Sequence, residues 1–154
     1  MIGGAVVDSG GVLILNHSTI DGGLRADGGK LGIYATTDGP SVIHGGLTGY
    51  NLDALQIMGA VIDGQASVSG KAAQLDFICS STIGGGLTVS GFKNLVVGNP
   101  PDCKGNTITG GVSFTNSTNV TFNGNDVSGG ATCSGTTFAS PPTGNTITGS
   151  NSCF

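Results

Sequence analysis

Three side chains capable of acid–base chemistry stand at equivalent places in the sequence, each directly after an isoleucine. They are Asp21, His44 and Asp63, separated by 23 and 19 residues. If their segments stack like neighbouring strands, the two carboxylates lie roughly 9–10 Å apart with the imidazole between them. An inverting glycoside hydrolase uses an acid and a base about 6.5–9.5 Å apart. Arg25 follows Asp21 in the sequence and is suited to bind the carboxylate of an acidic sugar. Together these four residues form a candidate catalytic site. The alternative is a solvated polar column beside a turn, where Asp is common.

A second group of polar side chains is suited to binding. Ser and Thr alternate with apolar residues in three short segments, so the hydroxyls share one side of each expected strand. The candidate binding residues are Thr88, Ser90, Ser113, Thr115, Thr132 and Ser134. A flat, uncharged hydroxyl face suits a repetitive partner, such as a glycan, another protein surface or ice. Alternatively, these are ordinary outward strand residues that keep a protein of low charge hydrated.

Both groups belong to a repeat with a period near 20 residues. Seven segments carry an aliphatic anchor that is followed, one residue later, by Gly-Gly or a close variant. The anchors, spaced by 19–25 residues, are Ile20, Ile43, Ile62, Ile83, Ile108, Val127 and Ile147. A period of this length that tolerates insertions predicts one supersecondary unit per repeat, stacked on its neighbours.

Each unit contains three short strand-like stretches and three bends, which describe one coil of a parallel β-helix. We therefore predict an all-β solenoid of about eight coils of 19–25 residues, forming a single domain over residues 1–154. The Gly-Gly pair predicts a corner with positive φ. Strands at 75–77, 95–97 and 120–122 precede their anchors. The phenylalanines expected to point into the core are Phe77, Phe114 and Phe122.

Three asparagines are expected to be structural. Asn106, Asn125 and Asn145 each stand two residues before an anchor, which points them inward. A buried amide must find hydrogen-bond partners. Stacked amides can satisfy one another along the column, so we predict a structural ladder.

Four cysteines allow three pairings, and stacked coils favour one of them, so the cysteines test the predicted stacking. Cys133 and Cys153 each lie six residues after an anchor, whereas Cys79 and Cys103 lie four and five residues before one. Neighbouring coils bring each pair within disulfide reach, which predicts Cys79–Cys103 and Cys133–Cys153. The alternative is four reduced, buried thiols. Disulfides imply an oxidising compartment, and hence a secreted or cell-surface protein. No metal-ligand spacing is present, so neither a metal nor another cofactor is expected.

Composition narrows the classes of partner. Charged residues make up 9% of the chain, and five Lys and Arg in a chain of net charge −4 supply no basic patch for nucleic acid. No apolar run approaches the roughly 18 residues of a membrane span. The expected partners are therefore a polysaccharide or a protein surface, including another copy in end-to-end or lateral association.

The sequence also resembles a known group. The runs 124–135 and 144–149, with Cys153, resemble the C-terminal end of secreted actinobacterial repeat proteins. Nearly the whole chain is similar to right-handed parallel β-helices of the pectin-lyase-like kind, and this resemblance implies a right-handed coil. That superfamily includes polysaccharide lyases, glycoside hydrolases, adhesins and phage tailspikes, so the resemblance leaves the activity open. The local motifs and long loops of its pectinases are not matched here.

We favour a non-enzymatic, extracellular structural or binding module that acts through its lateral faces. The alternative is a polysaccharide-active enzyme that uses Asp21, His44 and Asp63, with ice binding as a minor alternative. The chain starts in mid-coil, without a signal peptide or a capping helix. We therefore expect a trimmed fragment of a secreted protein, or an end covered by another chain.

Overall fold

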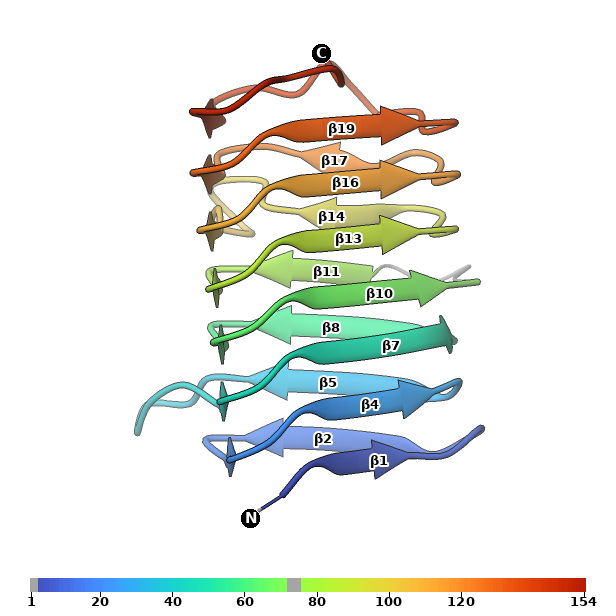
Figure 1. The fold of residues 1–154 in the computed structure, drawn as a ribbon, viewed down its shortest axis with the longest axis vertical. Coiled ribbons are helices and arrows are strands. Elements are labelled where there is room, and N and C mark those ends of the chain that lie inside the picture. The colour runs from blue at the N-terminus through green and yellow to red at the C-terminus, as the bar shows by residue number, and fades with distance from the viewer. Residues whose placement is uncertain (1–2, 72–75) are drawn as a thin grey trace.

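The chain coils into a right-handed parallel β-solenoid with three strands in each turn (Figure 1). The computed structural model describes residues 3–71 and 76–154. Over these residues the strands make about seven turns, where the repeat predicted about eight coils. The predicted fold class is confirmed. Leu75, expected in a strand, lies outside the described residues.

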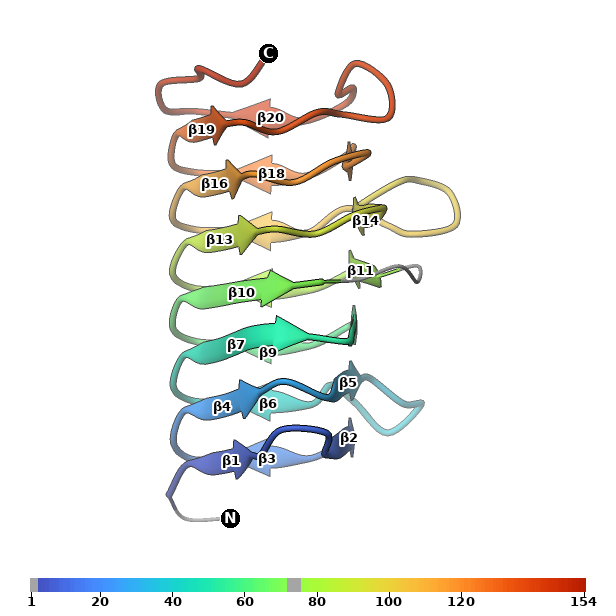
Figure 2. The ribbon, with the colours of Figure 1, turned by 90° about the vertical axis from the view of Figure 1, so that its right-hand side faces the viewer.

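The strands form three parallel sheets that run the length of the solenoid (Figures 1 and 2). Sheet A contains β1 (Ala5–Val7), β4 (Leu24–Asp27), β7 (Leu47–Leu52), β10 (Ala66–Gly70), β13 (Leu87–Ser90), β16 (Val112–Thr115) and β19 (Ala131–Ser134). Sheet B contains β2 (Val12–Asn16), β5 (Lys30–Tyr34), β8 (Ala54–Met58), β11 (Asp76–Cys79), β14 (Leu95–Val97) and β17 (Thr121–Phe122). Sheet C contains β3 (Thr19–Ile20), β6 (Val42–Ile43), β9 (Val61–Ile62), β12 (Thr82–Ile83), β15 (Thr107–Ile108), β18 (Asp126–Val127) and β20 (Thr146–Ile147).

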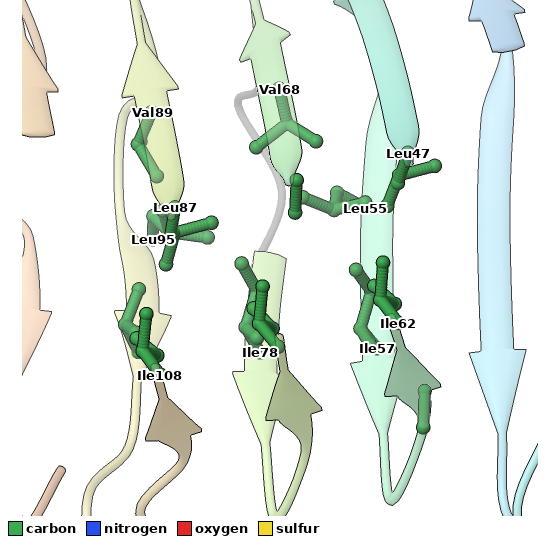
Figure 3. Close-up of a cluster of buried hydrophobic side chains, with 14 of the residues drawn as sticks. Leu47, Leu55, Ile57, Ile62, Val68, Ile78, Leu87, Val89, Leu95 and Ile108 are labelled. Carbon is green, nitrogen blue, oxygen red and sulfur yellow. The ribbon is translucent and has the colours of Figure 1, made fainter. Parts of the chain in front are cut away.

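The core is built from aliphatic columns, one residue from each coil (Figure 3). The seven anchors stack in register along sheet C, and all but Ile147 are buried. A second buried column in sheet A contains Leu24, Leu47, Ala66, Leu87, Val112 and Ala131. Because side chains alternate across a strand, the neighbours of each column residue within its own strand face outward.

The glycines at the corners have a different role from the predicted one. None of the Gly-Gly corners that follow the anchors has positive φ; the bends that do include Gly124 and Gly144. The corner backbones instead touch between coils. A Cβ added at Gly45 would lie 2.7 Å from the backbone nitrogen of Gly23, and one at Gly129 would lie 2.5 Å from that of Gly111. Glycine is needed there because successive backbones approach too closely for a side chain.

The expectation that Phe77 belongs to the core is wrong. Phe77 pairs with Gln56 on one side and Val96 on the other, which places it on the outer face of sheet B. Asp76 takes the inward position instead and is fully buried. A shift of one residue along a strand exchanges its two faces. Phe114 and Phe122 are buried as predicted.

A cluster of aromatic rings closes the C-terminal coils. Phe114 and Phe122 meet edge to face with ring centroids 5.2 Å apart, and Phe154 contacts both Phe122 and Phe138. Such pairs stabilise beyond their buried area. None of the described segments forms a helix long and apolar enough to cross a membrane.

Candidate functional site

The predicted hydroxyl face exists on the outer side of sheet A. Thr88, Ser113 and Thr132 align on successive strands. Ser90, Thr115 and Ser134 form a parallel rank two residues further along the same strands. All six hydroxyl residues are half-buried or exposed. The structure therefore brings the whole predicted set onto one surface of three adjacent coils.

The face is longer than the sequence analysis predicted. Thr48 and Ser67 continue the first rank on β7 and β10, and Ser69 continues the second. The alternation in Ala66-Ser67-Val68-Ser69 is the same as in the next coil, so the period was the signal that would have found them. The first rank thus spans five coils.

Most of these hydroxyls face outward without a bond of their own. Over residues 3–71 and 76–154, Thr88 accepts a hydrogen bond from Gln65 and Ser69 bonds backbone groups near the end of β7. No side-chain hydrogen bond to another described residue is made by the hydroxyls of Thr48, Ser67, Ser90, Ser113, Thr115, Thr132 and Ser134. Each hydroxyl can both donate and accept. The surface is therefore an array of free hydrogen-bonding groups.

One end of the same face is charged and aromatic. Arg25 pairs with Thr48 in the ladder, and Asp27 pairs with Tyr50. The Arg25 guanidinium lies 5.5 Å from the centroid of the Tyr50 ring and 3.6 Å from the Asp27 carboxylate. Tyr50 remains 46% exposed. An exposed ring beside an arginine adds a stacking surface to the hydroxyl ranks.

The candidate catalytic residues also lie together, at the corner between sheets C and A. His44 Nδ1 lies 2.8 Å from the Asp63 carboxylate, within hydrogen-bond distance. His44 Nε2 lies 3.9 Å from the Asp21 carboxylate. All three side chains are about half exposed. Arg25 lies on β4 in the first of these coils, on the outer face of sheet A beside Tyr50 and not in this cluster.

This corner places an acid–base pair on an exposed surface. An Asp that orients a His is half of the usual arrangement for general base catalysis. Here, however, both imidazole nitrogens face carboxylates. None of the three residues lines a hollow among those found over the described residues. The half-exposed side chains are open to water, and an exposed pair of this kind stabilises weakly.

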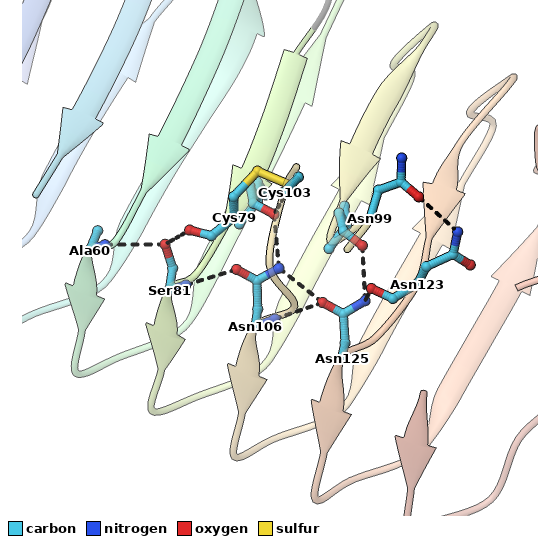
Figure 4. Close-up of a disulfide and its surroundings, with 10 residues drawn as sticks. Ala60, Cys79, Ser81, Asn99, Cys103, Asn106, Asn123 and Asn125 are labelled. Carbon is cyan, nitrogen blue, oxygen red and sulfur yellow. Dashed lines mark hydrogen bonds between the residues drawn. A yellow bond between two sulfur atoms is a disulfide. The ribbon is translucent and has the colours of Figure 1, made fainter. Parts of the chain in front are cut away.

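The predicted asparagine ladder holds the bend between sheets B and C (Figure 4). Asn106 Nδ2 donates to Asn125 Oδ1 at 2.9 Å, and Asn125 Nδ2 donates to Asn145 Oδ1 at 3.0 Å. Each amide also donates to a carbonyl of a neighbouring segment. In earlier coils Ser81 and Ser41 accept the backbone N–H of the coil below through their hydroxyls. The asparagines and these two serines therefore have a structural role in the column.

Both predicted disulfides are confirmed. Cys79 is bonded to Cys103 and Cys133 to Cys153, with Cα–Cα distances of 5.1 and 5.0 Å. They suggest an oxidising compartment. Over the described residues no group of three or more His, Cys, Asp or Glu side chains is placed to hold a metal ion.

The interior holds one carboxyl group that the sequence analysis did not single out. Asp76 Oδ1 accepts the backbone N–H of Leu55 at 2.7 Å, and Oδ2 has no partner among the described residues. Burial raises the pKa of Asp76 from 3.8 to about 6, against the smaller lowering effect of the Leu55 hydrogen bond. Asp76 points away from both candidate surfaces, so we assign it no functional role.

The comparisons with known proteins add no relative to this description. No protein-family model, no curated protein and no solved structure matches this chain.

Proposed function

We propose that this protein is a non-enzymatic, extracellular binding module whose sheet A face contacts a polysaccharide. The observation that carries the proposal is the array of hydroxyls in register over five coils, most of them without a bond inside the protein. The two disulfides support secretion, because such bonds persist in oxidising compartments. We propose as well that the chain is related to the pectin-lyase-like and actinobacterial repeat proteins.

The chemistry of the face favours a long partner over a single sugar. A hydrogen bond contributes only about 0.5–1.5 kcal/mol net, because it replaces a bond to water. A few hydroxyls thus bind one sugar weakly, whereas ranks along several coils engage many units of a polymer at once. Linked contacts of this kind raise the overall affinity without any single strong site. Tyr50 and Arg25 add a stacking contact at one end.

Retention on immobilised polysaccharides tests the proposal. We expect the protein to be retained by at least one member of a neutral and acidic panel, such as cellulose, chitin, xylan and pectin. Thr115→Lys places a long charged side chain in the middle of the face and abolishes the retention. The matched control is Thr121→Lys, since Thr121 is equally half-buried but lies on the outer face of sheet B. Retention that Thr121→Lys removes as well, or no retention by any polymer, contradicts the proposal.

The second candidate is a polysaccharide-active enzyme, and the hydrogen bond between His44 and Asp63 is the observation in its favour. The same hydroxyl ranks also leave ice as a minor candidate partner. Shaped ice crystals and thermal hysteresis that Thr115→Lys removes would support ice binding, and smooth disc growth would exclude it.

A further inference from the structure

The outer face of sheet B carries a hollow unrelated to the candidate sites described above. It measures about 400 Å³ and is lined by Met58, Phe77, Cys79, Val96, Asn99, Asp102 and Cys103. The loop 98–105 projects past the sheet (Figure 2). Its residues Asn99, Asp102 and Cys103 form one wall of the hollow. The Cys79–Cys103 disulfide ties this loop to β11 (Figure 4). The volume is within the usual range of small-molecule sites, about 300–1,000 Å³.

The floor of the hollow is apolar, in contrast to the outer face of sheet A in the same coils. Phe77 and Val96 are neighbours in the ladder, and Met58 lies at the end of the adjacent strand. All three point outward, and Met58 is 41% exposed. The outward positions of β10, β13 and β16 on sheet A hold Ser and Thr instead. An aromatic ring beside a thioether forms a surface suited to a flat apolar group.

The rim of the hollow carries one charged side chain, the carboxylate of Asp102. Asp102 is exposed and forms no ion pair with any residue in the described ranges. Asn99 lines the same hollow and is held by two backbone hydrogen bonds with Cys103 and by the Asn123 amide. No Lys or Arg lines the hollow. A carboxylate without a counter-ion beside an apolar floor is complementary to a cation with an apolar body.

We propose that this hollow binds a small organic cation: an ammonium or guanidinium group carried on an aromatic or short aliphatic body. The apolar body lies over Phe77, Met58 and Val96, and the cationic group reaches Asp102. This site is on a different face from the proposed polysaccharide surface and does not depend on it. The hollow is open to solvent, so we expect affinity in the millimolar range for a ligand of fewer than a dozen heavy atoms.

Methyl NMR of Met58 tests the site with two probes of similar size and opposite charge. The chain has two methionines, so a sample labelled at the methionine methyl carbon gives two signals, assigned with Met58→Leu. Phenethylammonium is expected to shift the Met58 signal saturably, whereas phenylacetate leaves it in place. Asp102→Asn weakens phenethylammonium binding about threefold, as an exposed charge pair would. Asp53→Asn, which removes an exposed carboxylate outside the hollow, leaves the affinity unchanged.

A second variant addresses the apolar floor. Val96→Lys fills the hollow with a cation from the protein itself and abolishes the shift. The circular dichroism and thermal midpoint of each variant confirm that the solenoid is intact. The proposal is overturned if phenethylammonium does not move the Met58 signal. It is equally overturned if phenylacetate binds as well as the cation, or if Asp102→Asn has no effect. Retention on polysaccharides is measured separately, so the two proposals fail independently.

Discussion

Asn125 accepts two hydrogen bonds from Asn106 on a single side-chain oxygen, one from the backbone N–H and one from the side-chain amide, each at 2.9 Å. The same side chain donates to the carbonyls of Val97 and Asn123 and to the side-chain oxygen of Asn145. One amide thus connects three coils through its two polar atoms.

The first prediction concerns this position in the ladder. Asn125→Ala removes all five of these contacts and leaves a buried N–H of Asn106 without its partner, so we expect a loss of about 3 kcal/mol in the free energy of unfolding. Asn145→Ala removes three contacts at the end of the ladder, in a less buried place, and costs about half as much. Urea denaturation measures both values. Equal losses would contradict the view that the interior of the ladder is the more important part.

The second prediction separates two adjacent glycine positions of the corner. Gly45→Ala forces its Cβ to within 2.7–2.9 Å of the backbone of Gly22 and Gly23, and costs about 1–3 kcal/mol through overpacking. At Gly23 the nearest atom to an added Cβ is the Gly46 carbonyl oxygen at 3.3 Å, so Gly23→Ala is tolerated. The chain already holds Gln65 and Ser150 at that second position. Thermal unfolding of the two variants checks this, and a larger loss from Gly23→Ala would refute it.

The third prediction is a dependence of stability on pH that arises from Asp76. Its pKa is raised to about 6 in the folded protein, whereas the unfolded chain releases this proton near pH 4. The folded state therefore holds the proton more tightly. The contribution of Asp76 to stability is fully present below about pH 4 and is lost as pH rises through about 6. We expect a decline of about 2 kcal/mol, less than the full shift implies, because relaxation and water penetration screen a buried charge.

Asp76→Asn tests this decline directly. The amide keeps an oxygen for the Leu55 N–H and cannot ionise, so the variant is more stable than the parent above pH 6 and matches it near pH 4. Denaturation curves at four pH values between 4 and 7.5 measure the difference. If the stability of Asp76→Asn declines with rising pH as much as that of the parent protein, another group is responsible for the decline.

The fourth prediction addresses the enzymatic alternative. The proposed binding role predicts no release of reducing sugar from any polymer in the panel. Asp63→Ala then changes the free energy of unfolding by less than about 1 kcal/mol, because the His44–Asp63 pair is exposed. A hydrolase or lyase would instead be established if reducing sugar is released by the parent protein and by Asp38→Ala. Asp63→Ala and Asp21→Ala would each have to abolish that release. Asp38 is an exposed carboxylate of another loop and serves as the matched control.

Much of the fold was predictable because stacking imposes one rule on every coil. The 19–25-residue spacing of the anchors placed Ile20 and its equivalents in one column. Equal offsets from the anchors aligned the asparagines and paired Cys133 with Cys153, and nearly equal offsets paired Cys79 with Cys103. The prediction that Phe77 points into the core was wrong for a physical reason. Asp76-Phe77-Ile78-Cys79 has apolar residues on both faces, so its alternation is ambiguous and only the register with Gln56 decides it.

The candidate sites differ in how far the sequence could reveal them. The hydroxyl ranks repeat with the coil, and the period alone would have extended them to Ser67 and Thr48. The hollow on sheet B was invisible, because its wall is the loop 98–105. The geometry of that loop depends on a disulfide and on Asn99, and not on the repeat. Insertions within a solenoid carry no periodic signal by which to place their side chains.

The C-terminal half of the solenoid has more stabilising cross-connections between its coils than the N-terminal half. Both disulfides, the asparagine ladder and the aromatic cluster lie at residue 79 or beyond. The described coils before residue 79 are held by aliphatic packing, side-chain hydrogen bonds such as those of the serine hydroxyls, and an exposed ion pair. In a stack where each layer rests only on its neighbours, melting advances layer by layer from the weaker end. We therefore expect heat or force to unfold the N-terminal coils of this chain first and the coils from Cys79 onward later. Amide hydrogen exchange would record this order as a step in protection near Cys79.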